Sequence, residues 1–447
     1  MKLNPLGGVG VSAAGKHLHD TTKTAINSLR WVGDVASKKD TMYEVEISIE
    51  QLGNIGIEIV DKAKQWEGNK AFNLIENVIG IVCEMGKKAV ENEWVNVIES
   101  SINVFGDIYV KAGEKKMLRT GYKAPISVIT RNILHIVEAA IDKGPEFATN
   151  FVAKPLKEFC IRAMNMAVKK KDEDFDEVLI NISFEIAGDV AYIGEKAIEK
   201  EDKVIEDVVR NLAEIGTEIA KAENRSYINR LTRDISLSKD YIIQHLSDIT
   251  DKILDKEEGF LERGLISPIT NFHRKIPADY AGGFLSTPSE IIRENPEVEP
   301  ELEVKYKWVV TCLKEIGLKT SRKPLDRPTK KIIKTLIELG VLCIRDGLSK
   351  ALEPEFAAKP LAELAIRTKE EMVESACKDY YESKKEFPKD QKAFAKFKKL
   401  YEDELKKKKK CSGCSRMVIP SIFLNLSTFL RSISLAFIST TPPFIAS

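Results

Sequence analysis

The chain has 447 residues, enough for two or three ordinary domains or for one long array of repeats. Hydrophobic residues make up 43% and can build cores, while 31% charged and only 7% aromatic residues favour helices with solvated faces over β-sandwiches. Seven cysteines, one of them necessarily unpaired, do not form a disulfide framework, and the glycine-rich N-terminus is a poor signal peptide. We therefore predict a cytoplasmic protein.

The net charge of +1 conceals an uneven distribution. Residues 319–334 carry seven basic groups against one acid, and residues 384–410 carry twelve lysines against five acids. The remainder of the chain is therefore acidic. An acidic body beside a basic C-terminal third can steer a charged partner.

Residues 1–15 are predicted to be a flexible, glycine-rich arm. The segment Gly10–Lys16 has the spacing of a phosphate-binding loop, but His17 stands where a Ser or Thr should bind Mg²⁺. Too few residues precede this segment for the strand and turn that such a loop needs. His17, His19 and Asp20 could ligate a metal, yet no other histidine is near in sequence, so a solvated pair is preferred. We predict no metal and no cofactor.

Residues 16–263 are predicted to be a helical repeat domain. Proline is absent from residues 6–124 and 156–267, as expected of long helices, because an internal proline costs a helix about 3 kcal/mol. Apolar residues recur there with helical spacing and form four stripes. The stripes are Leu52, Ile55, Ile59 and Ala63; Ile75, Val78, Ile79 and Val82; Val178, Ile182, Ile186, Val190, Ile193 and Ala197; and Ile205, Val208, Leu212, Ile215 and Ile219.

An apolar residue followed by glycine recurs within these stripes. Glycine inside a helix costs about 1 kcal/mol relative to alanine, so its repeated use predicts that a neighbouring helix passes close at that level. The alternative is that some of these glycines end helices. The pairs are Ile55-Gly56, Met85-Gly86, Phe105-Gly106, Ile193-Gly194, Ile215-Gly216 and Ile316-Gly317.

One segment occurs twice. Residues 145–162 read PEFATNFVAKPLKEFCIR, and residues 354–367 read PEFAAKPLAELAIR. Removing Thr149–Val152 from the first copy leaves eleven identities in fourteen aligned positions. Pro155 and Pro360 are predicted to open a long helix in each copy.

The match continues upstream at a constant offset of 203, where Pro125 aligns with Pro328 and Gly144 with Gly347. Proline suits the first turn of a helix and glycine suits the residue after its end. Each copy is therefore predicted to be a helical hairpin. The copies span residues 125–162 and 328–367.

Residues 264–300 contain five prolines and three glycines and are predicted to be a linker. Residues 301–405 are predicted to be a second, shorter helical domain. Near its end Phe394, Phe397 and Tyr401 fall on one helix face, which predicts docking on the helical core. The surrounding lysines and aromatic residues can equally bind nucleic acid.

Residues 406–447 begin with five lysines, which are solvated or face something anionic because adjacent lysines cannot all pack. Residues 418–438 are 21 long, enough to span a bilayer, although Pro420 and the charge of Arg431 weaken that interpretation. Three interpretations stay open: a membrane anchor, a segment folded onto the helices, and a sequence shifted out of its reading frame. The predicted contacts to an anionic partner or membrane are Lys406, Lys407, Lys408, Lys409, Lys410 and Arg416.

No motif in the sequence nominates a catalytic site, and we predict that the protein is not an enzyme. The predicted fold is all-α, an α-solenoid of stacked helical hairpins with one internal duplication. Such proteins hold a protein partner, so we expect a scaffold for protein–protein interaction. The first alternative is a peripheral or tail-anchored membrane protein that uses residues 406–447. The second is a nucleic-acid-binding protein that uses the basic C-terminal third.

Overall fold

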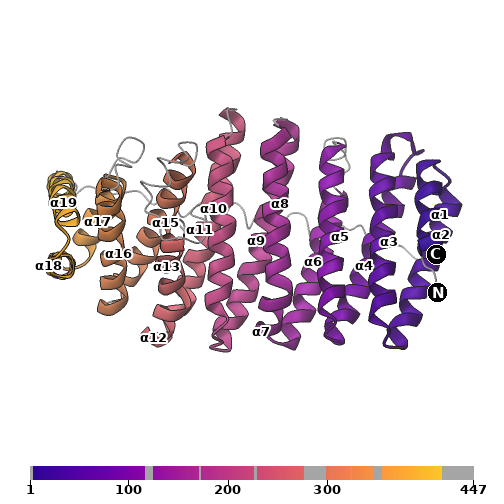
Figure 1. The fold of residues 1–447 in the computed structure, drawn as a ribbon, viewed down its shortest axis with the longest axis horizontal. Coiled ribbons are helices and arrows are strands. Elements are labelled where there is room, and N and C mark those ends of the chain that lie inside the picture. Colours follow the sequence, from indigo (N-terminus) through magenta and orange to yellow (C-terminus); the bar gives the residue numbers. More distant parts are fainter. Residues whose placement is uncertain are drawn as a thin grey trace, which may run out of the picture.

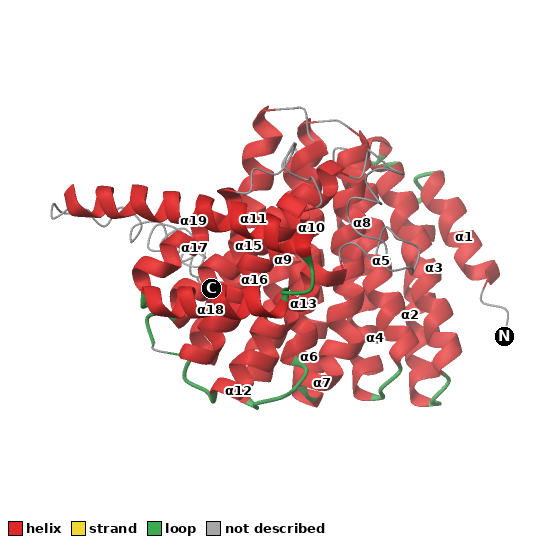
Figure 2. Ribbon diagram, turned by 60° about the vertical axis from the view of Figure 1, so that its left-hand side comes forward, coloured by secondary structure: helices red, strands yellow, loops and turns green. Residues whose placement is uncertain are grey.

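The computed structural model describes residues 4–115, 124–170, 173–225, 229–275, 299–323, 325–345 and 355–414. Within these ranges every regular element is a helix and no strand occurs, so the predicted all-α class is confirmed. The helices stand side by side in one long array (Figure 1), which Figure 2 shows from a second direction.

Successive long helices alternate between two layers, because they form hairpins and every second helix returns to the same side. Layer A consists of α2 (His19–Lys38), α4 (Lys70–Glu91), α6 (Ala124–Lys143), α9 (Glu173–Glu199), α11 (Asn229–Ile253), α15 (Glu299–Thr320), α17 (Glu355–Arg367) and α19 (Pro388–Cys414). Layer B consists of α1 (Asn4–Gly15), α3 (Met42–Asp61), α5 (Val95–Glu114), α8 (Lys154–Lys170), α10 (Ile205–Arg225), α13 (Ser267–Lys275), α16 (Asp326–Arg345) and α18 (Glu370–Ser383). Along each layer a helix packs against its neighbours, and α16 reaches the turn that precedes α13. Stacked hairpins of this kind are the predicted solenoid arrangement.

The predicted apolar stripes form the core between and within the layers. Ile55, Val78, Val190 and Leu212, one from each stripe, are fully buried. Burial of each such side chain stabilises the fold by about 1.5–3 kcal/mol relative to its exposure. Since the buried residues belong to one continuous cluster that runs from Ala14 to Tyr401, the described helices share a single core.

Several turns that end a helix contain a residue other than glycine in the left-handed conformation. The backbone φ angle is 56° at Asp40, 60° at Glu93 and 54° at Glu201. The next amide in each turn donates to the carbonyl five residues earlier, as Trp94 does to Ala89 at 2.8 Å. This bond satisfies a carbonyl that the helix end would otherwise leave unpaired.

Each copy forms two helices, α6 and α8 in the first copy and α16 and α17 in the second. The helices of the second copy pack on each other as the predicted hairpin does, whereas α6 contacts the short helix α7 (Pro145–Ala148) and the turn that leads into α8. Pro125 and Pro328 lie in the first turn of α6 and α16 as predicted, and Pro155 is the second residue of α8. Pro360 differs from the prediction, because α17 already begins at Glu355 and this proline lies inside it.

The first copy contains a π turn, Thr149–Ala153, between the short helix α7 (Pro145–Ala148) and α8. This turn contains the four residues that the second copy lacks. Four extra residues rotate an α-helix by one full turn plus about 40°, and a wider π turn absorbs the excess. The π turn also widens the backbone at Phe151, whose carbonyl the ring of Pro155 would meet in a regular helix.

A third copy of this arrangement lies where the sequence predicts a linker. The short helix α12 (Glu258–Leu261), a π turn (Glu262–Ile266) and α13 follow one another as α7, the first π turn and α8 do. Phe260, Pro268 and Phe272 occupy the places of Phe147, Pro155 and Phe159 in the first copy. Leu265, Ile266 and Ile269 are fully buried, so residues 264–270 contribute to the core. Residues 276–298 lie outside the described residues.

The predicted arm and the predicted boundary both differ from the structure. Residues 4–15 form α1, which packs against α2 and α3, because its glycines allow close approach: a Cβ on Gly10 would lie 2.9 Å from Cγ1 of Ile55. The predicted second domain continues the same stack, since α15 packs against α10, α11 and α13.

The predicted role of the helical glycines is confirmed. A Cβ on Gly56 would lie 2.7 Å from Ile108 of the next layer B helix, and a Cβ on Gly86 would lie 2.7 Å from Ile136 of the next layer A helix. Real Cβ atoms do not approach other atoms so closely, so glycine is required where two helices touch. Gly106, Gly194, Gly216 and Gly317 are crowded in the same way.

Candidate functional site

Four of the five adjacent lysines at the end of α19 are paired with carboxylates of the chain itself. Lys406 lies 3.9 Å from Asp403 and Lys407 lies 2.6 Å from Glu404, both on α19. Two more reach other helices and join α19 to its neighbours. These pairs are Lys408 with Glu363 of α17, at 3.5 Å, and Lys409 with Glu370 of α18. Arg416, the other predicted contact, lies outside the described residues.

The N-terminal histidines take part in packing and surface contacts. The ring of His17 meets Trp66 edge-on, with 5.8 Å between the ring centroids, and Nδ1 of His19 lies 3.0 Å from an Asp20 carboxylate oxygen. In the part of the chain that the structure describes, no group of three His, Cys, Asp or Glu side chains is placed to hold a metal ion. None of the described helices has the length and apolar character needed to cross a membrane. Residues 418–438 lie outside those helices.

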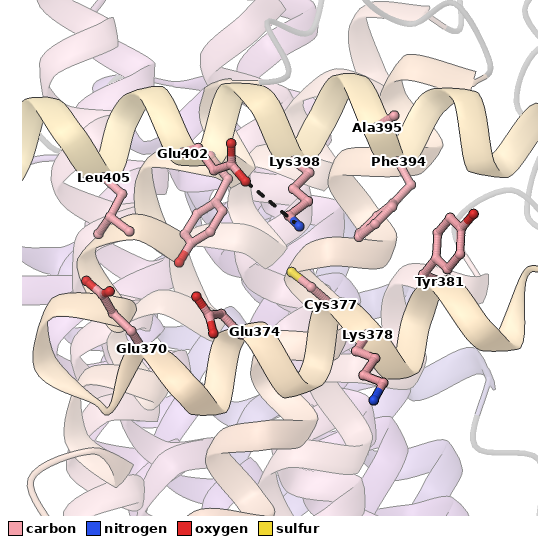
Figure 3. A pocket seen from close by; sticks show the side chains of 11 residues that line it. Glu370, Glu374, Cys377, Lys378, Tyr381, Phe394, Ala395, Lys398, Glu402 and Leu405 are labelled. Carbon is pink, nitrogen blue, oxygen red and sulfur yellow. Dashed lines mark ion pairs between the residues drawn. The ribbon is translucent and has the colours of Figure 1, made fainter.

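A groove of about 680 Å³ runs between α18 and α19 (Figure 3). Its floor is apolar and includes Phe394, Tyr401 and Leu405 of α19. Cys377 of α18 points into the groove, and burial raises the pKa of its thiol to about 11. The thiol is therefore neutral near pH 7 and is not an activated nucleophile.

The rim of this groove is charged. Glu370 and Glu374 rise from α18 toward α19, and Glu402 lies across from them on α19, 3.9 Å from Lys398 (Figure 3). Tyr381 closes one end and is 44% exposed. An apolar floor with an acidic rim suits an amphipathic segment that carries a cation.

A second candidate lies on layer A, where α6 meets α9. Glu138 of α6 and Glu185 of α9 both raise the pKa of Asp189, although burial of the Asp189 carboxyl is the larger cause, and together they bring it to about 8. Neither Glu185 nor Asp189 has an ion pair among the described residues. The carboxyl groups of Glu138 and Glu185 thus act on Asp189 across the junction of α6 and α9, and Glu138 also lies 3.3 Å from Nδ1 of His135 on α6.

Aromatic residues of α11 border these carboxyl groups. The rings of Tyr241 and His245 meet edge-on with 4.4 Å between centroids, and the His245 ring lies 3.8 Å from the position that a Cβ on Gly188 of α9 would take. Nε2 of His245 is buried and has no hydrogen-bond partner among the described atoms. Burial lowers the pKa of His245, so its ring is neutral near pH 7.

This carboxyl cluster cannot be recognised in the sequence, because its members come from helices far apart in the chain. We name Glu138, Glu185 and Asp189 the acidic ridge. Elsewhere along layer A, neighbouring helices are joined by pairs of opposite charge, for example Lys88 with Asp34 at 2.7 Å and Lys252 with Glu195. At the acidic ridge, by contrast, carboxyl groups of α6 and α9 interact with one another across the junction.

No protein-family model and no curated protein matches this chain. One solved structure similar to it is described as a "Circular tandem repeat protein with novel repeat topology and enhanced subunit contact surfaces". The two chains share 14% sequence identity at a TM-score of 0.43, over 91% of this chain and 95% of that one. The class of protein is defined by the helices of this chain themselves: an all-α protein of stacked helical hairpins.

Proposed function

We propose that the protein is a non-enzymatic scaffold that binds a protein partner on layer A, at the acidic ridge. The observation that carries the proposal is the meeting of Glu138 and Glu185 with Asp189, where the neighbouring junctions place a base. Carboxylates that repel one another are stabilised by a cation from outside. A lysine or arginine side chain of a partner supplies such a cation.

The residues around the acidic ridge suit a basic peptide segment of a partner protein. Tyr241 is 41% exposed, and an exposed aromatic face attracts lysine and arginine side chains. The carboxyl groups lie on rigid, packed helices, so little order has to be gained on binding. A basic partner is also steered toward a chain whose bulk is acidic.

A fluorescent peptide of alternating lysine and serine serves as the probe, with binding followed by anisotropy. We expect the triple change Glu138→Gln, Glu185→Gln and Asp189→Asn to weaken binding by about tenfold, because charge pairs across an interface contribute up to several kcal/mol. The matched control removes three carboxyl groups from layer B through Glu44→Gln, Glu50→Gln and Glu58→Gln. Equal loss of affinity in both variants would mean that net charge, and not the acidic ridge, attracts the peptide.

A partner from cells can then be sought by affinity capture at low salt, with the two triple variants compared side by side. The proposal expects a protein that is retained by the unmodified chain and the layer B control but lost with the acidic-ridge variant. A set of captured proteins that is the same for all three chains would count against it.

A further inference from the structure

The two ends of the array carry surfaces that complement each other. Figure 1 places α1 and α2 at one end and α18 and α19 at the other. In a helical array each unit covers the apolar face of the unit before it, so the two terminal units each keep a face without a neighbour among the described helices. Because these faces lie at opposite ends, those of one chain cannot reach each other.

The N-terminal face follows the seam between α1 and α2. Leu6 of α1 and Trp31 and Val32 of α2 line a hollow of about 440 Å³ there. The residue before Trp31, Arg30, pairs with Glu84 of α4 at 2.9 Å, and Trp31 points about 100° further round the helix, away from α4. Trp31 is 63% exposed. An exposed tryptophan beside apolar neighbours is typical of a protein interface.

The C-terminal face is the groove between α18 and α19, and its apolar floor can receive an indole ring. Figure 3 looks into this groove with other helices of the array behind it, so the groove opens away from them. Phe394 of α19 lies opposite the stretch of α18 between Cys377 and Tyr381. A tryptophan buried in such a groove loses a large apolar surface from water and often dominates the energy of an interface.

The charges on α2 and α18 favour one relative direction of the two helices. α18 begins with Glu370 and Glu371, and the exposed Lys385 follows its end. α2 has Asp20 in its first turn and Lys38 in its last. When the two helices lie antiparallel, the acidic start of each lies beside the basic end of the other. A parallel arrangement would bring like charges together at both ends, which disfavours binding.

The spacing of residues along the helices sets the register of this antiparallel contact. Both helices advance about 1.5 Å per residue, so Lys38 lies about 10.5 Å from Trp31 along α2. When Trp31 lies against Phe394, opposite residues 377–381 of α18, Lys38 falls opposite residues 370–374. That part of α18 supplies the acidic side chains of the groove's rim.

We propose that one copy of the chain binds the next end to end, with α2 of one copy lying antiparallel in the groove between α18 and α19 of the other. Trp31 covers the apolar floor, and Lys38 pairs with Glu374, which forms no ion pair with a described residue of its own chain. The two faces differ, so the contact is heterologous, and copies assemble into an open filament or a closed ring. This contact does not involve the acidic ridge, so its test is independent of the proposed function.

Sedimentation velocity of the full chain at increasing concentration measures this assembly, and we expect oligomers that grow with concentration. Trp31→Ala should weaken association at least about tenfold, because it removes the largest side chain of the contact. The groove variant, Glu374→Lys with Tyr381→Lys, should do the same, and circular dichroism checks that changes at these exposed positions leave the fold intact. The control is Tyr43→Ala on α3, which is 68% exposed but lines neither face, so association should be unchanged. A chain that is monomeric at every concentration, or oligomers that neither variant weakens, would overturn the proposal.

A mixture of the two variants tests whether the contact is head to tail. The Trp31→Ala chain keeps an intact groove, and the groove variant keeps an intact α2. At a concentration where neither variant associates alone, the mixture should form a dimer through the one intact contact and nothing larger. A mixture that stays monomeric would contradict a head-to-tail contact.

A charge exchange tests the predicted register. Lys38→Glu should weaken association by about fivefold, the effect expected of one surface ion pair turned into a repulsion. Adding Glu374→Lys to the same chain should restore association, and restoration also shows that both changes leave the fold intact. Association that stays weak in this double variant, with its circular dichroism unchanged, would rule out the pairing of Lys38 with Glu374.

Discussion

Gly216 of α10 lies directly beneath the indole ring of Trp308 of α15, where a Cβ would come within 2.6 Å of Cε2. The ring is 1% exposed and packed on all sides, so it cannot move aside. This contact crosses the place where the sequence suggests a boundary between two domains. The glycine thus allows the two parts to form one core.

Replacing Gly216 by alanine should lower the free energy of unfolding by about 1–3 kcal/mol, because the added methyl group has no space. Urea unfolding followed by circular dichroism measures this loss. Gly80→Ala in α4 is the matched control, since a Cβ there would meet nothing within 4 Å. We expect it to stabilise the protein by about 0.5–1 kcal/mol. Similar effects of the two changes would show that helix propensity alone matters.

Asp61 at the end of α3 is surrounded by Lys115 at 2.7 Å, Lys111 at 3.1 Å and Lys62 at 3.1 Å. These three cations hold the pKa of the Asp61 carboxyl well below its usual range. Asp61→Asn should cost about 1 kcal/mol at pH 7. A carboxylate with a lowered folded pKa stabilises above its unfolded pKa, so the difference should shrink below about pH 4.

The control for this pH dependence is Glu67→Gln. Glu67 is exposed and pairs with a single lysine, Lys70, at 3.0 Å. We expect no measurable change in the thermal midpoint of this variant at pH 7. A loss at Asp61→Asn that stays constant from pH 7 to pH 3 would show that the carboxylate charge is not its cause.

The pKa of Asp189 is shifted upward, in the direction opposite to that of Asp61. Its pKa of about 8 exceeds that of an unfolded aspartic acid, so the folded chain holds the proton more tightly and loses stability as the pH rises from about 4 to 8. Asp189→Asn should therefore leave the free energy of unfolding unchanged at pH 5 and raise it at pH 9, by roughly 1 kcal/mol for a half-buried group. The exposed Asp142→Asn is the control and should show no such pH dependence.

Binding of a basic segment at the acidic ridge should depend on pH for the same reason. A cation favours the ionised form of Asp189, so binding below pH 8 releases a proton and is weaker there. We expect the affinity for the lysine–serine peptide to rise between pH 6 and pH 8 and then level off. Asp189→Asn should remove this rise, and anisotropy titrations at four pH values measure it. A wild-type affinity that falls as the pH rises toward 8 would contradict the assignment.

The lysines at the end of α19 should differ in their roles. Lys408 and Lys409 contact other helices, so changing both to glutamine should lower the free energy of unfolding of the C-terminal helices by roughly 1 kcal/mol. Changing Lys406 and Lys410 should leave stability unchanged. Titration with heparin then tests for anion binding, which the second pair should weaken more than the first. The reverse order would contradict these roles.

The sequence predicts the helices and their close contacts well, because both depend on local patterns. Apolar spacing identifies the buried faces, and a glycine such as Gly56 within an apolar stripe marks a helix–helix contact. Gly10 also marks a helix–helix contact, but the glycines of residues 4–15 indicate flexibility in the sequence because no apolar stripe accompanies them.

The third copy could have been found, since Phe260, Pro268 and Phe272 repeat the spacing of Phe147, Pro155 and Phe159. The high density of proline in residues 264–300 instead indicates a linker. The acidic ridge could not be found in this way. Glu138 and Asp189 are brought together by the packing of α6 on α9, and acidic residues are too frequent in this chain for their sequence positions to single them out.

The π turns at Thr149–Ala153 and Glu262–Ile266 bear on how such a chain can lengthen during evolution. One inserted residue would rotate every later side chain of the helix by about 100° about the helix axis and expose apolar side chains to solvent. Four inserted residues that include one π turn leave the side chains of the following helix pointing in almost their original directions. Insertions and deletions in this lineage should therefore accumulate in steps of a whole turn.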